Sequence, residues 1–432
     1  MDKKDIFKKI IIEMQKIKVS FIQRQLKLPF DFKKVITLYG PRRCGKTYLF
    51  YQTIRELLDK GIPSNRVLYI NFEDERILPF EKDDWELLLD TYFELYPENL
   101  TKKIYLFLDE VQEVPYWEKF VRRVSEKENY QIFLTGSSSK LFSTEIATAL
   151  RGRTVSYFLM PFSFGEFLRF KNLELEKHFE YSSIRHKIKK LFWEYLQFGG
   201  FPEVIEKDEL FKTQILQGYF ELIFYKDIVE RYKIRNFTLM KDLMRYLISH
   251  FSSLFSITGY YNFLKSSGLK IGKDTLFEYL SCLEEVNFIK LVPLFDFSLK
   301  RQMVNPKKIY CIDTGLINAV SFQFSENRGR YLENLVFLEL LRQKKQIYYF
   351  RDNKDNEIDF LIAQDRKPIQ LIQVVTSLKE QKAKEREVVP LISSAKELKV
   401  EQCLILTEDE KTEINAGKLK IKVLPVWSWL LG

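Results

Sequence analysis

The sequence predicts an α/β protein in which a parallel sheet comes first, helical segments follow and a second α/β unit lies towards the C-terminus. From about residue 35 to residue 160, short apolar runs rich in β-forming residues alternate with segments of helical period, which is typical of an open parallel sheet. Residues 166–236 are rich in aromatic residues and helical in period. After residue 331 the order is helix, three strands, helix and a last strand, QCLILT.

The parallel sheet is predicted from four apolar runs. They are VITLY (35–39), RVLYINF (66–72), KIYLFLDE (103–110) and QIFLTG (131–136). Helices are expected between them, over residues 47–60 and 117–126. The N-terminal segment places Ile6, Ile10, Met14 and Ile17 on one helical face, so it is predicted to be a packing helix and not a signal peptide.

Residues 238–298 predict three helices followed by a strand pair, and Leu276, Leu280 and Leu283 mark the buried face of the third helix. This order is typical of a winged helix. A chain of 432 residues should contain two to four domains. We expect a nucleotide-binding domain over residues 1–165, a helical lid over 166–237, a winged helix over 238–320 and a second α/β domain over 321–432.

Composition and charge narrow the class of protein. Aromatic residues make up 15% and charged residues 30%, so the chain should be ordered almost throughout. The net charge of +10 and the pI near 9.0 suit a polyanionic partner such as DNA, although a soluble surface can carry the same charge. Four separated cysteines and three histidines predict neither a zinc site nor disulfides, and a reducing cytoplasm fits best. No apolar run is long enough to span a membrane.

The most informative motif is GPRRCGKT, which runs from Gly40 to Thr47 between a predicted strand and a predicted helix. In the pattern GxxxxGK[ST], glycines let the backbone fold so that successive N–H groups face phosphates, and the next helix adds its positive N-terminal end. We expect Lys46 to reach the β and γ phosphates of ATP and the Thr47 hydroxyl to ligate Mg²⁺. The predicted nucleotide-binding residues are Gly40, Pro41, Arg42, Arg43, Cys44, Gly45, Lys46, Thr47 and Tyr48.

An acidic pair, Asp109 and Glu110, closes the strand KIYLFLDE. We expect Asp109 to hold the metal's water shell and Glu110 to orient or deprotonate the attacking water. One strand later, Thr135, Ser137 and Ser138 carry hydroxyl groups that either contact the γ-phosphate or belong to an ordinary polar turn.

Two arginines in ALRGRT, Arg151 and Arg153, are candidates to stabilise transition-state charge, in cis or from a neighbouring subunit. Arginines at a helix end also cap carbonyl groups or lie in solvent. Both interpretations stay open from the sequence alone.

These motifs, with YINFED (69–74), FLDEVQEV, LTGSSSKLF, LRGRT and PFSFGEFL, resemble the AAA+ ATPases of the signalling-type (STAND) branch, which are prokaryotic and largely archaeal. The resemblance continues through YKDIVERY (225–232), KKIYCIDTGL (307–316) and YLENLVF (331–337) to the C-terminus. It implies an ATPase core, a helical lid, a winged helix and a C-terminal fold similar to PD-(D/E)xK nucleases, which is restriction-endonuclease-like.

A nuclease of that type needs a helix acid, an Asp after a turn and an acid-x-Lys pair on the next strand, where the acids hold Mg²⁺. Glu333 and Asp359 match the first two places, but the third place reads Gln373, Val374, Val375. Gln373 has a carbonyl oxygen for a metal, whereas Val375 cannot orient water. Lys367 or Lys379 would substitute only if the fold brought one of them in. A retained fold that binds DNA or protein is therefore expected, with Glu333 and Asp359 as a vestigial metal site.

The presumed reading helix of the winged helix carries Asp274, Glu278, Glu284 and Glu285, whereas base-reading helices usually present Arg, Lys, Asn or Gln. We therefore expect this helix to suit protein contacts. If DNA is bound, the candidate contacts are Lys300 and Arg301 with Lys307 and Lys308, or residues 342–345, although such basic runs are more often solvated faces.

The leading hypothesis is a cytoplasmic AAA+ ATPase, active as a homo-oligomer, that couples Mg²⁺-ATP hydrolysis to an action on DNA. The alternatives are a nucleotide-controlled switch or scaffold for a protein partner and, with less support, an ATP-dependent nuclease.

Overall fold

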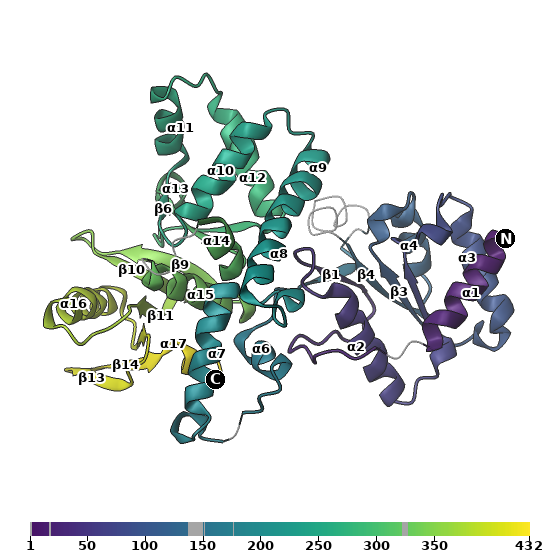
Figure 1. Ribbon diagram of the computed structural model, residues 1–432, viewed down its shortest axis with the longest axis horizontal. Coiled ribbons are helices and arrows are strands. Elements are labelled where there is room, and N and C mark those ends of the chain that lie inside the picture. The colour runs from purple at the N-terminus through teal and green to yellow at the C-terminus, as the bar shows by residue number, and fades with distance from the viewer. Residues whose placement is uncertain (1, 17–18, 137–149, 151, 176, 322–326) are drawn as a thin grey trace. The chain divides into compact units, whose positions relative to one another are not determined.

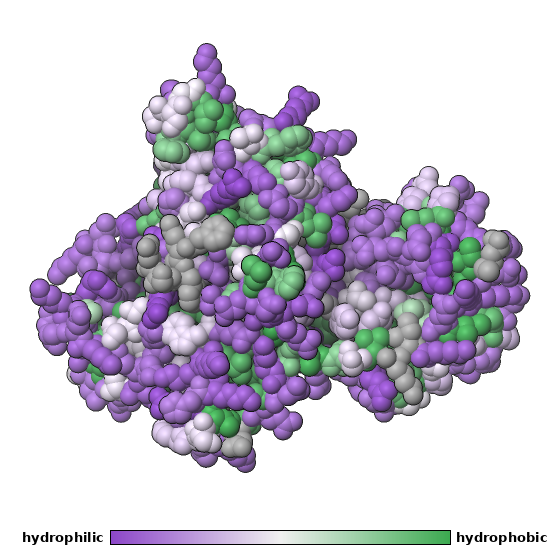
Figure 2. Space-filling view, viewed as in Figure 1, coloured by the Kyte–Doolittle hydropathy of each residue, from purple (hydrophilic) through white to green (hydrophobic). Residues whose placement is uncertain are grey.

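The computed structural model describes the chain except for residues 1, 17–18, 137–149, 151, 176 and 322–326. The described residues form two compact units, Met1–Pro161 and Phe162–Gly432. Figure 1 shows their elements, and Figure 2 shows a mainly hydrophilic face on which apolar residues form small separate patches. Within the described part of the chain, we find no helix with the length and apolar character that crossing a membrane requires.

The first unit is built on a parallel sheet of five strands in the order β2-β3-β4-β1-β5. The strands are β1 (Val35–Tyr39), β2 (Val67–Asn71), β3 (Ile104–Asp109), β4 (Tyr130–Thr135) and β5 (Thr154–Phe158). The helices are α1 (Lys3–Lys16), α2 (Lys46–Asp59), α3 (Asp84–Leu95) and α4 (Trp117–Ser125). The sheet confirms the predicted α/β class, but β5 is an additional strand that the sequence analysis did not predict.

Both faces of this sheet are buried, which explains its nearly continuous apolar strands. Alternate residues of a strand point to opposite faces: Leu106 and Leu108 of β3 pack with α1, α3 and α4, whereas Phe107 packs against α2. The rings of Phe107 and Phe133 stack on the α2 face with centroids 4.4 Å apart. Burial on both sides fixes the register of the strands and therefore the position of their ends. The glycine loop follows the end of β1, the acidic pair lies at the end of β3, and Thr135 ends β4.

The second unit begins with helices and a small antiparallel sheet. Its helices are α6 (Phe164–Phe170), α7 (Arg185–Phe198), α8 (Glu209–Leu222), α9 (Glu230–Tyr232), α10 (Phe237–Ser249), α11 (Ile257–Ser266), α12 (Lys273–Glu285), α13 (Leu299–Val304) and α14 (Thr314–Ser321). A π-helical segment, Ile223–Val229, joins α8 to α9. The strands β6 (Leu254–Phe255), β7 (Ile289–Val292) and β8 (Lys307–Cys311) form a sheet in the order β6-β8-β7.

A buried carboxylate ties α7 to α14 within this unit. Asp313, which is 3% exposed, accepts hydrogen bonds from the backbone N–H groups of Gly200 (2.8 Å), Gly315 (2.8 Å) and Leu316 (3.2 Å). Gly199 ends α7 with φ 75, and a Cβ atom there would lie 2.0 Å from Asp313 Oδ1. The position of Asp313 therefore requires a glycine at 199 and uses the N–H group of Gly200 as a hydrogen-bond donor.

The C-terminal part of the second unit contains a mixed six-stranded sheet in the order β13-β14-β12-β11-β10-β9. Its elements are α15 (Arg328–Arg342), β9 (Gln346–Arg351), β10 (Glu357–Gln364), β11 (Lys367–Val374), α16 (Gln381–Leu398), β12 (Gln402–Thr407), β13 (Thr412–Ala416), β14 (Leu419–Pro425) and α17 (Val426–Trp429). The prediction that QCLILT is the last strand is wrong, because β13 and β14 follow it. Both continue the sheet beyond β12 as a hairpin.

Candidate active site

The glycine loop leaves β1 at its carboxyl end and enters α2. Gly40 lies very close to Leu159, the residue that follows β5, which is the neighbour of β1 in the sheet. A Cβ atom on Gly40 would lie 2.0 Å from the carbonyl oxygen of Leu159. Gly45, with φ 95, occupies the N-cap of α2 in the left-handed region, which glycine reaches without steric cost. Backbone N–H groups at such a helix start attract phosphate. The loop therefore has the backbone form that its sequence predicted.

Arg24 holds the glycine loop through hydrogen bonds to backbone carbonyl groups. The sequence did not predict this role. Its buried guanidinium donates to the carbonyl oxygens of Cys44 (2.8 Å) and Met160 (2.6 Å), and its backbone N–H donates to Gln52 (2.7 Å). The arginine thus joins the loop, α2 and the segment after β5. No local motif marks it, because Cys44, Gln52 and Met160 lie far from it in the sequence.

Lys46 is the first residue of α2 and is 6% exposed. Its ammonium lies 3.4 Å from the carbonyl oxygens of both Gly40 and Pro41 and 3.5 Å from Glu110 Oε1. Burial alone lowers the pKa of Lys46, but the carboxylates of Glu110 and Asp109 outweigh it and the pKa is raised. The side chain therefore stays charged and is paired with the acid at the end of β3.

Asp109 is fully buried at the end of β3 and is surrounded by hydroxyl groups. Tyr69 donates to its Oδ2 atom at 2.7 Å, Thr135 donates to Oδ1, and Thr47 also forms a hydrogen bond with it. Burial raises the pKa of Asp109, while the bonds from Thr135, Tyr69 and Thr47 lower it in part. Thr47 and Asp109, the two predicted Mg²⁺ ligands at this site, are therefore adjacent.

Glu110 follows in the left-handed region, with φ 49, a conformation that non-glycine residues seldom adopt. Its backbone N–H donates to Thr135 Oγ1 at 2.9 Å, and Gln112 donates to Oε2 at 2.7 Å. Such strain persists only where the surroundings hold it in place. Thr135, the last residue of β4, therefore contacts both members of the acidic pair.

The remaining predicted residues are not all brought to this site. Ser137, Ser138 and Arg151 lie outside the described residues. Arg153 comes just before β5, where Thr154 pairs with Val35 at the start of β1, and its guanidinium bonds Glu126 at 2.8 Å. Arg153 therefore lies at the edge of the sheet opposite to the glycine loop of its own chain.

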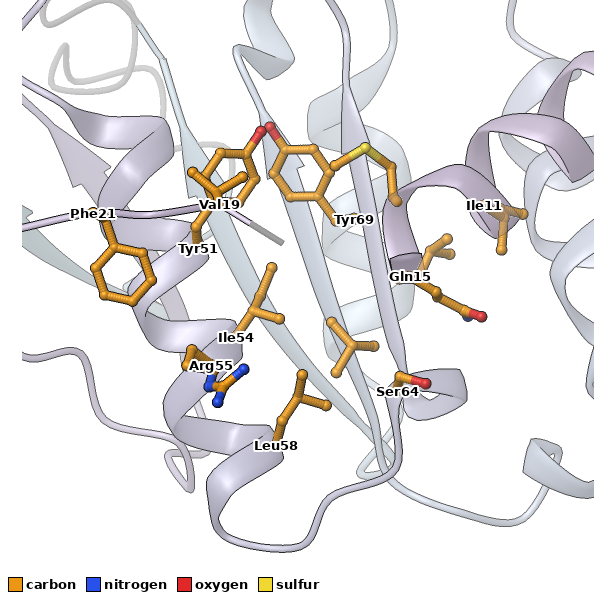
Figure 3. Close-up of a pocket in the computed structure, with 13 residues that line it drawn as sticks. Ile11, Gln15, Val19, Phe21, Tyr51, Ile54, Arg55, Leu58, Ser64 and Tyr69 are labelled. Carbon is orange, nitrogen blue, oxygen red and sulfur yellow. The ribbon is translucent and has the colours of Figure 1, made fainter. Parts of the chain in front are cut away.

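A cavity of about 190 Å³ lies beside the site, between α1, α2 and β2. Figure 3 shows apolar side chains such as Ile54 and Leu58 along its wall, and the hydroxyl groups of Tyr51 and Tyr69 facing each other. Tyr69 is the residue that donates to Asp109. Because this cavity lies along the middle of α2 and not at its start, it is separate from the glycine loop.

In the second unit, Glu333 and Asp359 lie together, but a lysine stands between them. Lys308 Nζ is 2.7 Å from Glu333 Oε1 and 2.9 Å from Asp359 Oδ1. The expectation that Lys308 contacts DNA is wrong, because its side chain is buried. Lys367 and Lys379 are both exposed, so neither takes the place of the missing lysine beside Glu333 and Asp359. Among the residues that the structure describes, no group of three or more His, Cys, Asp or Glu side chains is arranged to hold a metal ion.

Comparison with protein families divides the chain into three matched segments. A family described as an AAA domain matches residues 32–168, which include the glycine loop, Asp109 and Glu110. Two domains of unknown function, DUF8612 and DUF4143, match residues 189–327 and 328–429.

Relatives match almost the whole chain. "Uncharacterized protein MJ1544" of Methanocaldococcus jannaschii is 38% identical over 100% of this chain and 96% of its own length. A Haemophilus influenzae protein, "Uncharacterized protein", is 32% identical over 93% of this chain and 94% of its own length. Among solved structures, "the walker-type atpase paby2304 of pyrococcus abyssi" is similar at 15% identity and a TM-score of 0.42, over 66% of this chain and 90% of that one. The chain belongs to the family of P-loop proteins with an AAA domain that includes these archaeal and bacterial relatives.

Proposed function

We propose that the chain binds Mg²⁺-ATP at residues 40–48 and hydrolyses it. The observation that carries this proposal is the meeting of Lys46, Thr47, Asp109 and Glu110 at the carboxyl edge of the parallel sheet. A buried ammonium, a hydroxyl next to a carboxylate and a second, partly exposed carboxylate are the groups that phosphoryl transfer to water needs.

Each residue has a role set by its position. The N–H groups of the loop and the Lys46 ammonium bind the phosphates, while Thr47 and Asp109 provide the oxygen atoms that hold Mg²⁺. When bound there, Mg²⁺ would supply positive charge that neutralises the phosphate oxygens. Glu110 orients the attacking water and accepts its proton. Thr135 positions Glu110 through the backbone N–H and Asp109 through Oδ1.

We further propose that turnover is coupled to DNA and that the chain acts as a homo-oligomer. The net charge of +10 supports a polyanionic partner. The place of Arg153, away from the glycine loop of its own chain, supports a role on the nucleotide of a neighbouring subunit. Ser137 and Arg151 are proposed to contact the γ-phosphate or the transition state.

The coupling is tested by measuring ATP turnover with and without duplex DNA over a range of salt concentrations. We expect DNA to raise turnover several-fold at low salt, and the apparent affinity for DNA to fall linearly on a log–log plot against salt, because bound counterions are released. Turnover that ignores DNA, or DNA binding that disappears well below physiological ionic strength, would contradict the coupling.

A second candidate function, a switch that contacts a protein partner, is favoured by an exposed apolar segment around α13. Phe297, Leu299, Met303 and Val304 are 81%, 61%, 79% and 72% exposed. Clustered apolar side chains on a surface mark sites of contact with other proteins, among other uses. The proposed reading helix α12 also exposes acidic residues, Asp274 and Glu278 among them.

Met303→Asp tests this second function, with Leu210→Asp as a matched control because Leu210 is also exposed, at 67%, but lies on α8. If the α13 segment binds a partner, a copurifying protein changes ATP turnover of the wild type and of Leu210→Asp but no longer binds Met303→Asp, while basal turnover stays the same. Equal binding to all three proteins rules the segment out.

A further inference from the structure

A lysine from the small antiparallel sheet fills the acidic pocket of the C-terminal sheet. Lys308, on β8, places its Nζ atom 2.7 Å from Glu333 Oε1, 2.8 Å from Glu357 Oε1 and 2.9 Å from Asp359 Oδ1. Glu333 belongs to α15, whereas Glu357 and Asp359 belong to β10. An ammonium group has three N–H donors, so each donor has its own carboxylate.

Each of the three carboxylates also contacts a second donor besides Lys308. Tyr310 donates to Glu333 Oε1 at 2.7 Å, the backbone N–H of Val374 donates to Asp359 Oδ2 at 2.9 Å, and Arg351 lies 3.4 Å from Glu357 Oε2. Buried charges are tolerated where they are paired and hydrogen-bonded in this way. The pocket is therefore a complete polar network around one internal cation.

These residues do not fit a divalent metal while Lys308 is in place. Mg²⁺ needs oxygen ligands in near-octahedral geometry at about 2.0–2.1 Å, and the Lys308 ammonium stands where such an ion would meet Glu333 and Asp359. The side chain of Gln373 is used elsewhere: Oε1 accepts from the Asp359 N–H at 3.3 Å and Nε2 donates to Glu387 at 2.7 Å. Val375 is buried in the apolar core.

We propose that the ammonium of Lys308 is the resident cation of this acidic pocket, and that the pocket is a structural tie between β8 and the six-stranded sheet, not a divalent-metal centre for cutting nucleic acid. Lys308 lies outside the segment, residues 328–429, that carries the acids. The charge that completes the pocket therefore comes from a neighbouring part of the same unit. Removing the lysine should both weaken this tie and open a place for a metal ion.

Metal binding gives the first test. Binding of Mn²⁺ to the full-length, nucleotide-free protein is measured from the electron paramagnetic resonance signal of the free ion. Wild type and Asp359→Asn should bind the same amount, because the pocket takes no metal in either. Lys308→Ala should bind one more ion than the double variant Lys308→Ala/Asp359→Asn. Stronger binding by wild type than by Asp359→Asn would overturn the proposal.

Thermal unfolding gives the second test. Lys308→Met keeps an unbranched side chain one atom shorter but leaves three carboxylates without their cation, so the Tm should fall by roughly 10 °C. Lys367→Met, on an exposed lysine at the start of β11, is the control and should leave the Tm unchanged.

Adding Glu333→Gln to Lys308→Met should recover part of the Tm, because a carboxylate that has lost its partner is removed. An unchanged Tm in Lys308→Met, or simple addition of the two single effects, would overturn the structural tie. If Lys308→Met fails to fold and the double variant folds, the coupling is supported. If neither folds, the Mn²⁺ comparison of wild type with Asp359→Asn decides the question.

Discussion

Glu110→Gln should bind ATP and fail to turn it over. The amide keeps the size of the side chain but cannot accept a proton from water, so kcat should fall roughly 100- to 10,000-fold. Binding should be kept or become tighter, because the amide no longer forms an ion pair with Lys46, whose ammonium lies 3.5 Å from Glu110 Oε1. Single-turnover hydrolysis and the Kd of a fluorescent ATP analogue measure the two effects separately.

Two controls frame this result. Glu113→Gln makes the same change on an exposed neighbour that shares the hydrogen bond from Gln112 but not the contact with Lys46, so turnover should stay near the wild-type value. Lys46→Ala should lose productive binding altogether, because the phosphates lose their buried cation. Normal hydrolysis by Glu110→Gln would mean that another residue orients the water.

Asp313→Ala should destabilise the second unit by about 3 kcal/mol, because three buried N–H groups lose their acceptor. These are the N–H groups of Gly200, Gly315 and Leu316. The Tm should fall by roughly 5–10 °C. Asp208→Ala is the matched control, because Asp208 also caps a helix, α8, but is exposed and accepts one bond, from Phe211; it should cost about 1 kcal/mol.

The effect of Asp313 should also depend on pH. Burial raises the pKa of Asp313 from 3.8 to about 6, so the folded chain holds this proton more tightly than the unfolded chain. The part of the stability that comes from this tighter proton binding is therefore fully present below the unfolded pKa of 3.8 and is lost as the pH rises through about 6. The hydrogen bonds from the three N–H groups remain at neutral pH. Denaturant unfolding should show a smaller difference between wild type and Asp313→Ala at neutral pH than in acid. A difference that grows with pH would contradict this assignment.

The sequence was most informative where burial leaves a simple pattern. The run VITLY coincides with β1, and the other three predicted strands differ from β2, β3 and β4 by about one residue at either end, because strands buried on both faces are continuously apolar. The strand β5 was missed because its residues are only half-buried or exposed. The hairpin of β13 and β14 was missed because β13 is half-buried or exposed and lysines alternate with apolar residues at the start of β14.

The candidate site also has residues that the local sequence predicts and residues that only the folded chain brings together. Its loop is a local motif, so Gly40 to Thr47 and the strand after it could be found by spacing alone. Arg24, Tyr69 and Lys308 could not, because each acts on residues that only the folded chain brings near. In particular, Lys308 was expected on the surface as one of several basic residues. The sequence around it does not predict contacts with three carboxylates from α15 and β10.

The contact between Lys46 and Glu110 bears on the proposed binding of phosphate. Because Glu110 Oε1 lies 3.5 Å from the Lys46 ammonium, a phosphate that binds this ammonium would compete with a carboxylate of the same chain. Like charges repel, so a phosphate bound at Lys46 would weaken the pairing of Glu110 with the ammonium. On this proposal one side chain serves two partners, because the carboxylate that pairs with Lys46 is also the group that would orient the attacking water.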